Sequence, residues 1–576
     1  MTLWNKIATF RKTPYAAYVV MAVFLLGILF QCLWFHWSVY GSLNYVFQKC
    51  SLFLIKLSIA GFIASFSLLC KRHYGAILVS LIIGFWSMAE MVYYRSNTIF
   101  IEEYSLLMVG NMDGVWDSVW LFNEASDWLF LLPSVLLTGV VLFFQSTQRC
   151  VKSFAVVAII AFVLNIIACI NLHVPNNCAH QKCRHGIKVI NPFASQGEGT
   201  LLGFTTEHYI MNTSVVHTLV YQLKELVLLP FKSEKYTLTN DEELLASQFI
   251  QPVKPLPTPK TSLIVLLVES FESWAITPDV TPNLCRFIEE TPHLLYAPHV
   301  KQQVRHGVSA DGQMIVNTGL LPVTDGATCF RFSQNEYPAI SKLYQHSGLI
   351  AAVSLSYWNQ KFMSDAYGID QNYVVESWHD KKIFQKVADV KNQHDFLLSL
   401  TMTMHAPFNA TPEQNYPKSE GMPDEMHRYL NAVMYMDKQL GVLLDSLMHD
   451  PVSSKATIVI TADHNVLSKD DRRVFNESNK AHHLGFGRIN GDIPLVIYSP
   501  QLEQRVMQVK PICQMDIYTT LLHLLGCESY YWKGFGVNVL HPNPRSLRII
   551  NAKEAQKLSD KLIRANYFER FGTYVQ

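Results

Sequence analysis

The strongest signal of fold class in this chain is Leu263-Ile264-Val265-Leu266-Leu267-Val268-Glu269, an apolar run that ends in a carboxylate. A second run, Thr457-Ile458-Val459-Ile460-Thr461-Ala462, is followed directly by Asp463-His464. Both runs are short and rich in branched side chains, which is typical of buried strands in a parallel sheet. Sites in open α/β sheets form just beyond the carboxyl ends of the strands. We therefore expect Glu269, Asp463 and His464 to meet at a metal site.

Two further apolar runs also end in polar or aromatic groups. Leu349-Ile350-Ala351-Ala352-Val353-Ser354-Leu355 leads to Tyr357-Trp358-Asn359, and Leu397-Leu398-Ser399-Leu400-Thr401-Met402-Thr403 leads to His405. An Asp-His pair after a single strand is common in ordinary turns, which is the plain structural alternative. Four strand ends that carry such groups favour a site for chemistry instead.

The size and composition of the chain indicate a protein with several parts. Its 576 residues exceed one ordinary domain. Its net charge of +1 gives no electrostatic reason to expect a nucleic acid partner. Charged residues make up 16% and apolar residues 49%, and the apolar excess falls in the first third of the chain.

Five apolar stretches in that first third are long enough to cross a bilayer. They are residues 14–35, 48–70, 74–94, 127–146 and 153–173. Almost no charge falls within them, the exceptions being Lys56 and Glu90. The alternative is a soluble bundle of buried helices. The length of the stretches and their charged flanks favour a transmembrane domain of five helices over residues 1–174.

Charged flanks also predict the orientation of the spans. Basic residues occur at Lys6, Arg11 and Lys12, then at Lys71 and Arg72, then at Arg149 and Lys152. The opposite ends are poor in Lys and Arg, and Arg95 is the exception. By the positive-inside rule the N-terminus is cytoplasmic, so residues after 174 are expected to be extracytoplasmic. A basic start can also mark a signal peptide, but no clear small-residue cleavage site follows. We therefore expect a multi-pass protein of the cell (inner) membrane.

Residues 175–260 form a juxtamembrane helical linker in this interpretation. Residues 208–229 have a helical pattern that suits either the membrane surface or packing against the next domain. Cys178 and Cys183 either form a disulfide or join nearby histidines in a small metal site. A catalytic domain is expected over residues 261–545, and a helical C-terminal tail over residues 546–576.

A candidate nucleophile lies between the first two metal-binding positions. The segment is Arg305-His306-Gly307-Val308-Ser309-Ala310-Asp311-Gly312-Gln313-Met314-Ile315-Val316. Ser309 is placed like a helix N-cap, where its hydroxyl would experience the positive end of the helix dipole. The same helix end favours a bound phosphate. Beside a divalent metal the hydroxyl could lose its proton and attack, although a structural N-cap is the alternative role.

These motifs together resemble lipoteichoic acid synthases. The similar segments are Glu269-Ser270-Phe271-Glu272-Ser273-Trp274, Gly307-Val308-Ser309-Ala310-Asp311-Gly312-Gln313, Tyr357-Trp358-Asn359, Thr403-Met404-His405-Ala406-Pro407-Phe408 and Ala462-Asp463-His464. Five spans before an outward-facing domain are also similar to that family. The segments 493–500 and 514–526 resemble the wider sulfatase and alkaline-phosphatase superfamily. The resemblance implies a sulfatase-like α/β fold after the membrane domain.

The resemblance also implies roles for individual residues. It implies that the metal is bound by Glu269, Ser309, Asp463 and His464, and that Ser309 is the nucleophile. It also implies that the substrate is bound by His405, Trp358, Asn359, Lys361 and His483. Two positions depart from the family, because serine replaces the usual threonine and Gln360 stands where an arginine normally follows the Trp-Asn pair. Lys361 is the nearest replacement cation, though it is a point charge rather than a planar fork.

The predicted activity is transfer of phosphoglycerol from phosphatidylglycerol to an extracytoplasmic glycan or glycolipid acceptor. An imidazole among oxygen ligands favours Mn²⁺, with Zn²⁺ and Mg²⁺ as alternatives. One alternative activity is phosphoethanolamine transfer, and another is hydrolysis by a sulfatase or phosphodiesterase. Asp311 and Gln313 stand where type I sulfatases need proline and arginine. A non-enzymatic scaffold would be expected to have lost its ligands. The sequence leaves the acceptor and the oligomeric state open.

Overall fold

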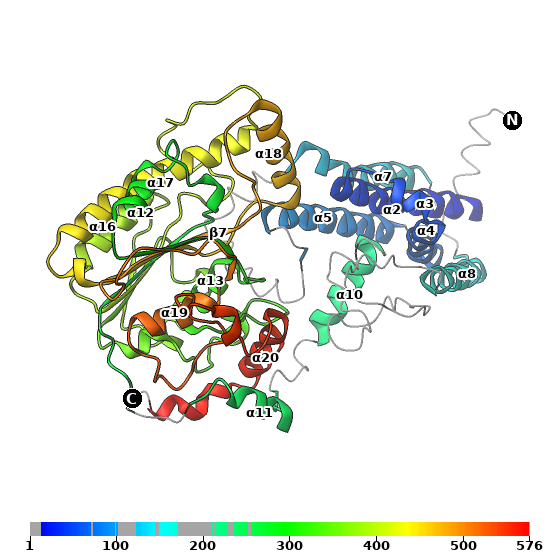
Figure 1. The fold of residues 1–576 in the computed structure, drawn as a ribbon. Coiled ribbons are helices and arrows are strands. Elements are labelled where there is room, and N and C mark those ends of the chain that lie inside the picture. The colour runs from blue at the N-terminus through cyan, green and yellow to red at the C-terminus, as the bar shows by residue number, and fades with distance from the viewer. Residues whose placement is uncertain are drawn as a thin grey trace. The chain divides into compact units, whose positions relative to one another are not determined.

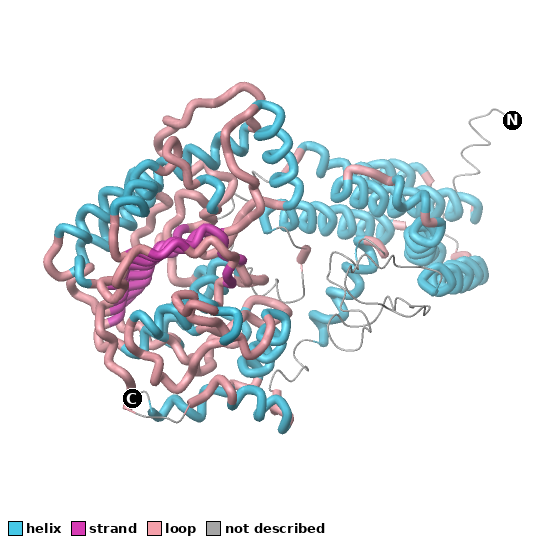
Figure 2. Tube along the Cα trace, in the orientation of Figure 1, coloured by secondary structure: helices cyan, strands magenta, loops and turns pink. Residues whose placement is uncertain are grey.

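The computed structural model describes residues 13–70, 73–97, 100–101, 123–144, 149–170, 210, 213–228, 236–251 and 255–574. These residues form two compact units, the first from the described residues within 13–228 and the second from those within 236–574 (Figure 1). The first unit is helical, and the second contains a sheet covered by helices (Figure 2). Cys178 and Cys183 lie outside the described residues.

The first unit contains five helices that are long and apolar enough to cross a membrane. These candidate spans are Tyr15–Tyr40, Cys50–Leu69, Tyr74–Arg95, Ala125–Phe143 and Val151–Ala168. They correspond to α2 (Pro14–Tyr40), α4 (Cys50–Ser65) with η1 (Phe66–Leu69), α5 (Tyr74–Asn97), η3 (Ala125–Leu131) with α7 (Leu132–Phe143), and α8 (Val151–Ile170). The short helix α3 (Asn44–Gln48) and α10 (Val215–Leu228) belong to the same unit. The prediction of five membrane helices is thus confirmed.

Two charges that interrupt the spans are buried and have partners in and beside α10. Lys56 Nζ donates to the Thr213 carbonyl oxygen at 2.5 Å. Glu90 Oε1 accepts from Gln222 Nε2 at 2.8 Å, and its Oε2 accepts from the Ile101 amide at 2.9 Å. Because an unsatisfied charge in hydrocarbon costs several kcal/mol, these contacts explain how the bundle tolerates both residues.

Arg95, the basic residue that departs from the charge pattern of the loops, is neutralised within the unit. Its guanidinium forms two hydrogen bonds to the fully buried Asp127 carboxylate, at 2.6 and 2.9 Å. Glu124 lies 3.4 Å from the same guanidinium. Arg95 is therefore balanced by acidic neighbours.

The second unit is built on a nine-stranded sheet of order β4-β3-β5-β1-β6-β7-β2-β8, with β9 paired to β2. The strands are β1 (Leu263–Val268), β2 (Leu294–Lys301), β3 (Ser347–Ala351), β4 (Gln371–Val374), β5 (Phe396–Leu400), β6 (Thr457–Ala462), β7 (Ile493–Tyr498), β8 (Val506–Met507) and β9 (Ile512–Cys513). Both neighbours of β1, namely β5 and β6, pair with it in parallel, whereas β7 is antiparallel to both β6 and β2. The predicted α/β fold class is confirmed. The strand expected over residues 349–355 ends earlier, at Ala351.

Helices cover both faces of this sheet (Figure 1). On one face lie α12 (Pro282–Glu290), α16 (Asp380–Val390) and α17 (Asp424–His449). On the other lie α13 (Val308–Thr318), α19 (Asp516–Leu524) and α20 (Ala552–Arg564). The remaining α-helices are α11 (Asn240–Ser247), α14 (Thr328–Arg331), α15 (Gln360–Ala366) and α18 (Lys469–His482). All six residues of β1 and of β6 are buried, as expected for central strands between two helical layers.

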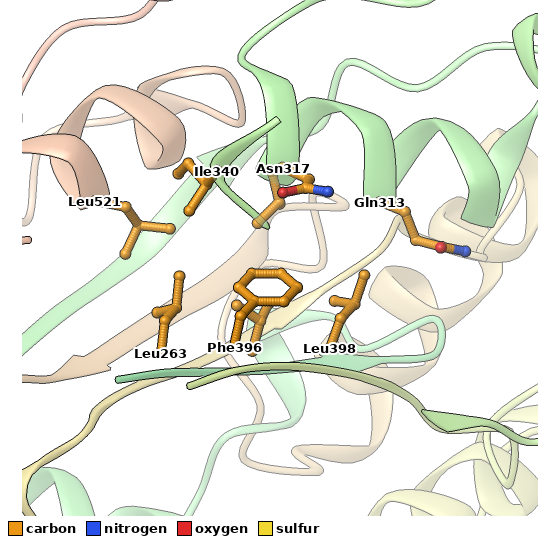
Figure 3. A pocket seen from close by; sticks show the side chains of 9 residues that line it. Leu263, Gln313, Asn317, Ile340, Phe396, Leu398 and Leu521 are labelled. Carbon is orange, nitrogen blue, oxygen red and sulfur yellow. The ribbon is translucent and has the colours of Figure 1, made fainter. Parts of the chain in front are cut away.

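A small cavity of about 10 Å³ lies between α13 and the sheet (Figure 3). Leu263, Phe396 and Leu398 line it from the sheet, and Gln313 and Asn317 line it from α13. A cavity of this volume holds one water molecule at most, so it is a packing defect below the helix rather than a binding site.

Candidate metal centre and nucleophile

The side chains that follow β1 and β6 converge at the carboxyl edge of the sheet. Glu269, Asp463 and His464 each offer one ligand atom, and these atoms lie within 4.8 Å of one another. All three residues are buried. The parallel register of β1 and β6 pairs Val268 with Ala462, so the next residue on each strand emerges at the same level. The sheet thus brings together the three residues that the sequence predicts as ligands.

Hydrogen bonds hold the two carboxylates in place. The Glu269 amide donates to Thr401 Oγ1 at 3.0 Å, and Ser270 Oγ donates to Glu269 Oε1 at 2.8 Å. The Ser270 amide donates to Asp463 Oδ1 at 2.9 Å. Ser270 has a φ of 57°, a left-handed conformation that is uncommon outside glycine. Sequence reasoning assigned no role to Ser270 or Thr401, because neither contact follows from a local pattern.

Ser309 lies beside the same three residues. Its Oγ lies 3.4 Å from Glu269 Oε2 and 3.3 Å from His464 Nε2. The expectation that Ser309 is the N-cap of its helix is wrong, because Gly307 is the N-cap of α13 and Ser309 is the second helical residue. Val308 between them has a φ of 41°, which is strained for a β-branched residue. This turn presents the Ser309 hydroxyl to the ligands instead of to the helix amides.

The turn that carries Ser309 depends on Asp311 and on a close approach at Gly312. Asp311 Oδ2 accepts from the amides of Arg305 and Gly307, both at 2.9 Å. A Cβ atom on Gly312 would lie 2.5 Å from the Asp463 carbonyl oxygen. Only glycine therefore lets α13 lie against the strand end that carries Asp463.

The electrostatics of the site fit a bound cation. Burial, and then the neighbouring Glu269 carboxylate, raise the pKa of Asp463 to about 7. Burial alone would lower the pKa of His464, but Asp463 and Glu269 raise it. Two buried carboxylates beside one imidazole are costly without a positive partner. Such a donor set suits Mn²⁺ or Zn²⁺, and a divalent ion would remove the repulsion between the carboxylates.

His405 follows β5 and lies near the ligands. Its Nδ1 is 2.7 Å from the Ala406 carbonyl oxygen, so Nδ1 carries a proton and Nε2 keeps a lone pair in the neutral ring. Burial lowers the pKa of His405, which favours that neutral ring. The ring stands edge-on to Trp378 with centroids 5.4 Å apart. Trp378 is a contact that the sequence did not predict.

The loop that carries His405 is fixed by the start of α16. The fully buried Asp380 accepts, through Oδ1, from the amides of Met402 and Thr403, both at 2.9 Å. Thr403 Oγ1 accepts from the Asp380 amide at 2.9 Å and donates to the Trp378 carbonyl oxygen at 3.1 Å. Both the position of His405 and its aromatic neighbour therefore depend on this junction.

Two family models match this chain. A sulfatase model matches residues 330–527, and a model of the lipoteichoic acid synthase N-terminal domain matches residues 2–182. The chain belongs to the lipoteichoic acid synthase family of the sulfatase superfamily. The site described above lies in the sulfatase-like domain of a multi-pass membrane protein of this family.

Relatives of this lipoteichoic acid synthase family member are distant. Lipoteichoic acid synthase 1 of Bacillus subtilis is 21% identical, over 85% of this chain and 80% of the relative. The lipoteichoic acid synthase-like protein YvgJ of Bacillus subtilis is 26% identical over 48% of this chain, which spans about half (49%) of that relative. The fold of most of this chain is also similar to the lipooligosaccharide phosphoethanolamine transferase EptA of Neisseria meningitidis. The TM-score is 0.50, at 12% identity, over 89% of this chain and 95% of EptA.

The segment after β3 differs from the pattern that the family resemblance implies. Trp358 and Asn359 have φ values of 50° and 53°, and Asn359 Nδ2 donates to the Cys329 carbonyl oxygen at 2.9 Å. Gln360 is buried and its Oε1 accepts from Gln313 Nε2 at 2.9 Å. The Lys361 side chain is exposed on α15. The position of the usual arginine thus holds a neutral side chain that binds α13.

His483 lies exposed at the end of α18, with a φ of 51°. Among the residues that the structure describes, no hydrogen bond or ion pair joins His483 or the Lys361 side chain to the three ligands. Their predicted contact with substrate stays a prediction.

Proposed function

We propose that this protein transfers the phosphoglycerol group of phosphatidylglycerol, with Ser309 as nucleophile, to an extracytoplasmic glycan or glycolipid. The observation that carries the proposal is the position of Ser309 Oγ, within 3.4 Å of Glu269 and of His464. A nucleophile needs a neighbour that favours loss of its proton, and here the hydroxyl lies against the predicted ligand set itself.

Glu269, Asp463 and His464 would hold the divalent cation, and we propose Mn²⁺. When bound, the cation supplies positive charge that favours ionised Ser309 and draws a phosphate into the site. His464 would bind through Nε2, because its Nδ1 lies 2.8 Å from the Asn465 carbonyl oxygen. Ser270 would keep both carboxylates oriented while this charge changes, and Thr401 would hold the Glu269 backbone.

The proposed reaction has two steps, and phosphorus forms one bond and loses another in each. Ser309 Oγ first forms a bond to phosphorus, the bond from phosphorus to the diacylglycerol oxygen breaks, and diacylglycerol leaves with a proton. The acceptor hydroxyl then attacks phosphorus, and Ser309 regains its proton as the phosphoserine bond breaks. His405 would contact the phosphate, and its unprotonated Nε2 could take the proton of the acceptor hydroxyl.

One observation supports phosphoethanolamine as a second candidate head group. Gln360 is neutral, buried and bound to Gln313, so it places no charge where the family resemblance implies an arginine. Phosphoethanolamine carries a positively charged amine, so its binding would depend less on that arginine than the binding of glycerol phosphate does.

The experiment that tests the proposal uses the purified full-length protein and two labelled lipids in separate reactions. Phosphatidylglycerol labelled in the head group is expected to leave a phosphoglycerol adduct on the Ser309 peptide, detected by mass spectrometry without acceptor. An adduct from phosphatidylethanolamine alone would favour the second candidate. A hydrolase would give a different result. The wild-type protein would then release free glycerol phosphate rapidly, and neither an adduct nor a product on the acceptor would be detected. Ser309→Ala is the matched control and should carry no adduct.

A further inference from the structure

The helix α10 buries several polar side chains against the bundle and exposes a stripe of apolar ones. Its inner side, and the turn before it, present buried polar residues to the bundle, namely Thr213, Ser214, His217, Thr218 and Gln222, beside the buried apolar residues Val215, Val216, Leu219 and Tyr221. Its outer side presents exposed apolar residues, namely Val220, Leu223, Leu226 and Val227, with the exposed Lys224 at their edge against the Tyr221 ring. In water such an arrangement would expose an apolar stripe and bury polar groups.

The polar side of α10 contacts three different spans. Thr213 accepts from Lys56 on α4, and Gln222 donates to Glu90 on α5. Between them, His217 Nε2 lies 3.3 Å from Asn165 Nδ2 on α8. The Gln222 side chain also accepts from Trp86 Nε1 at 3.0 Å. These contacts satisfy the inner face of α10 within the bundle.

The three contact points lie at a similar depth. Lys56 is about 9 Å along the axis from the start of α4, at 1.5 Å per residue. Glu90 is about 10 Å from the end of α5, and Asn165 about 8 Å from the end of α8 as described. Successive spans alternate in direction, so these three helix ends share one side of the membrane. A helix that touches all three lies across the bundle rather than along it.

The length of α10 agrees with this position. Its 14 residues extend about 21 Å, which is too short to cross the roughly 30 Å hydrocarbon core. A depth of about 8–10 Å is within the range at which amphipathic helices insert below the head groups. The spans also expose apolar side chains, such as Ile160 on α8, so the stripe on α10 has the same chemical character as the outer surface of the spans.

We propose that α10 is embedded in one leaflet, with Val220, Leu223 and Val227 against lipid acyl chains and its polar face against the spans. The occupant of the apolar stripe is the bilayer. This inference depends on the membrane unit alone and is independent of the chemistry proposed at Ser309.

The test replaces single residues of the full-length protein with the photo-crosslinker p-benzoylphenylalanine, in phosphatidylcholine nanodiscs. Leu223 and Val227 are the test positions, Ile160 is the lipid-facing reference, and Leu244 on α11 is the control. Leu244 is 68% exposed and lies in the second unit, so it matches Leu223 in residue type and in being exposed. Because all four side chains are exposed, the substitutions should leave the fold intact.

After irradiation, peptides with a lipid adduct are quantified by mass spectrometry. We expect adduct yields at Leu223 and Val227 similar to that at Ile160, and about tenfold above that at Leu244, because a membrane-inserted stripe meets acyl chains throughout. A yield at Leu223 no higher than at Leu244 would overturn the proposal. So would crosslinks from Leu223 to the sheet-containing unit in place of lipid, since that result means that the stripe packs against protein.

Discussion

The Ser309 Oγ and the His464 Nε2 lie 3.3 Å apart, although 155 positions separate the two residues in the chain. Ser309 comes from the second position of α13, and His464 from the connection after β6. The proposed nucleophile and one proposed metal ligand are thus carried by different layers of the domain. Any change that moves α13 relative to the sheet should alter their separation.

Ser309→Ala is expected to abolish head-group transfer while changing the free energy of unfolding by less than about 1 kcal/mol. Ser309 is not the N-cap of α13, so its loss removes no helix cap. Ser309→Thr should retain part of the activity, because threonine keeps the hydroxyl. Transfer of labelled head group and thermal unfolding would be measured on the same samples. Activity of Ser309→Ala equal to wild type would exclude the covalent mechanism.

Substitution of the two histidines should separate metal binding from catalysis. His464→Ala should lose both bound metal and activity, because it removes one of three ligands. Glu269→Ala and Asp463→Ala should behave in the same way. His405→Ala should lose at least about tenfold in turnover yet keep its metal. The proposed roles of His405, proton transfer and contact with the phosphate, affect the reaction rather than metal binding. Elemental analysis and transfer assays on the full-length protein would show the difference, and equal metal loss in His405→Ala would contradict it.

Removal of the metal should make stability depend on pH. The pKa of Asp463 is raised from an ordinary value of 3.8 to about 7, so the metal-free folded state holds a proton that the unfolded chain releases. Ionisation of Asp463 is therefore unfavourable to folding, and stability should fall as pH rises from about 4 to about 7. A bound cation displaces that proton and should abolish this fall. Melting temperatures with chelator or Mn²⁺ would be compared across the range, and parallel pH profiles would refute the prediction.

Gly312→Ala should weaken the site from outside the ligand set. The added Cβ would meet the Asp463 backbone at 2.5 Å, so α13 or the strand end must shift, at a cost of about 1–3 kcal/mol. We expect lower melting temperature, reduced metal affinity and reduced transfer. Gly487→Ala is the matched control, because no atom lies within 4 Å of its added Cβ. Similar effects in both variants would mean that the close approach is unimportant.

The orientation of the sheet-containing unit can be tested in cells. If the N-terminus is cytoplasmic, five crossings place the unit outside, and protease added to intact spheroplasts should digest it. A cytoplasmic marker protein monitors leakage, and detergent-treated cells give the full digestion pattern. Protection of the unit until detergent is added would reverse the proposed topology.

The sequence was informative where local pattern and sheet geometry coincide. Apolar runs identify β1 and β6, and parallel pairing brings Glu269 to Asp463 and His464. Contacts that depend on tertiary packing were not predictable. Thr401 contacts Glu269, and Ser270 contacts Asp463, through hydrogen bonds across the strand ends, and no periodicity marks such contacts.

The local conformation at Ser309 shows a second limit. A serine after glycine and valine at a helix start resembles an N-cap, but the positive φ of Val308 shifts the helix start. A β-branched residue is disfavoured in that conformation, so propensity predicts against it. The surrounding contacts of Asp311 and Gly312 impose it. Local rules fail here because the tertiary structure outweighs them.

The partners of Lys56 and Glu90 have a consequence for how the protein is made. Thr213 follows Lys56 by 157 positions, and Gln222 follows Glu90 by 132. A ribosome synthesises both charged spans long before it reaches the residues that satisfy them. The early bundle therefore forms without the Thr213 and Gln222 contacts, and it acquires them only when the segment 213–222 arrives. A chain shortened before that segment would leave Lys56 and Glu90 without these two contacts inside the membrane unit.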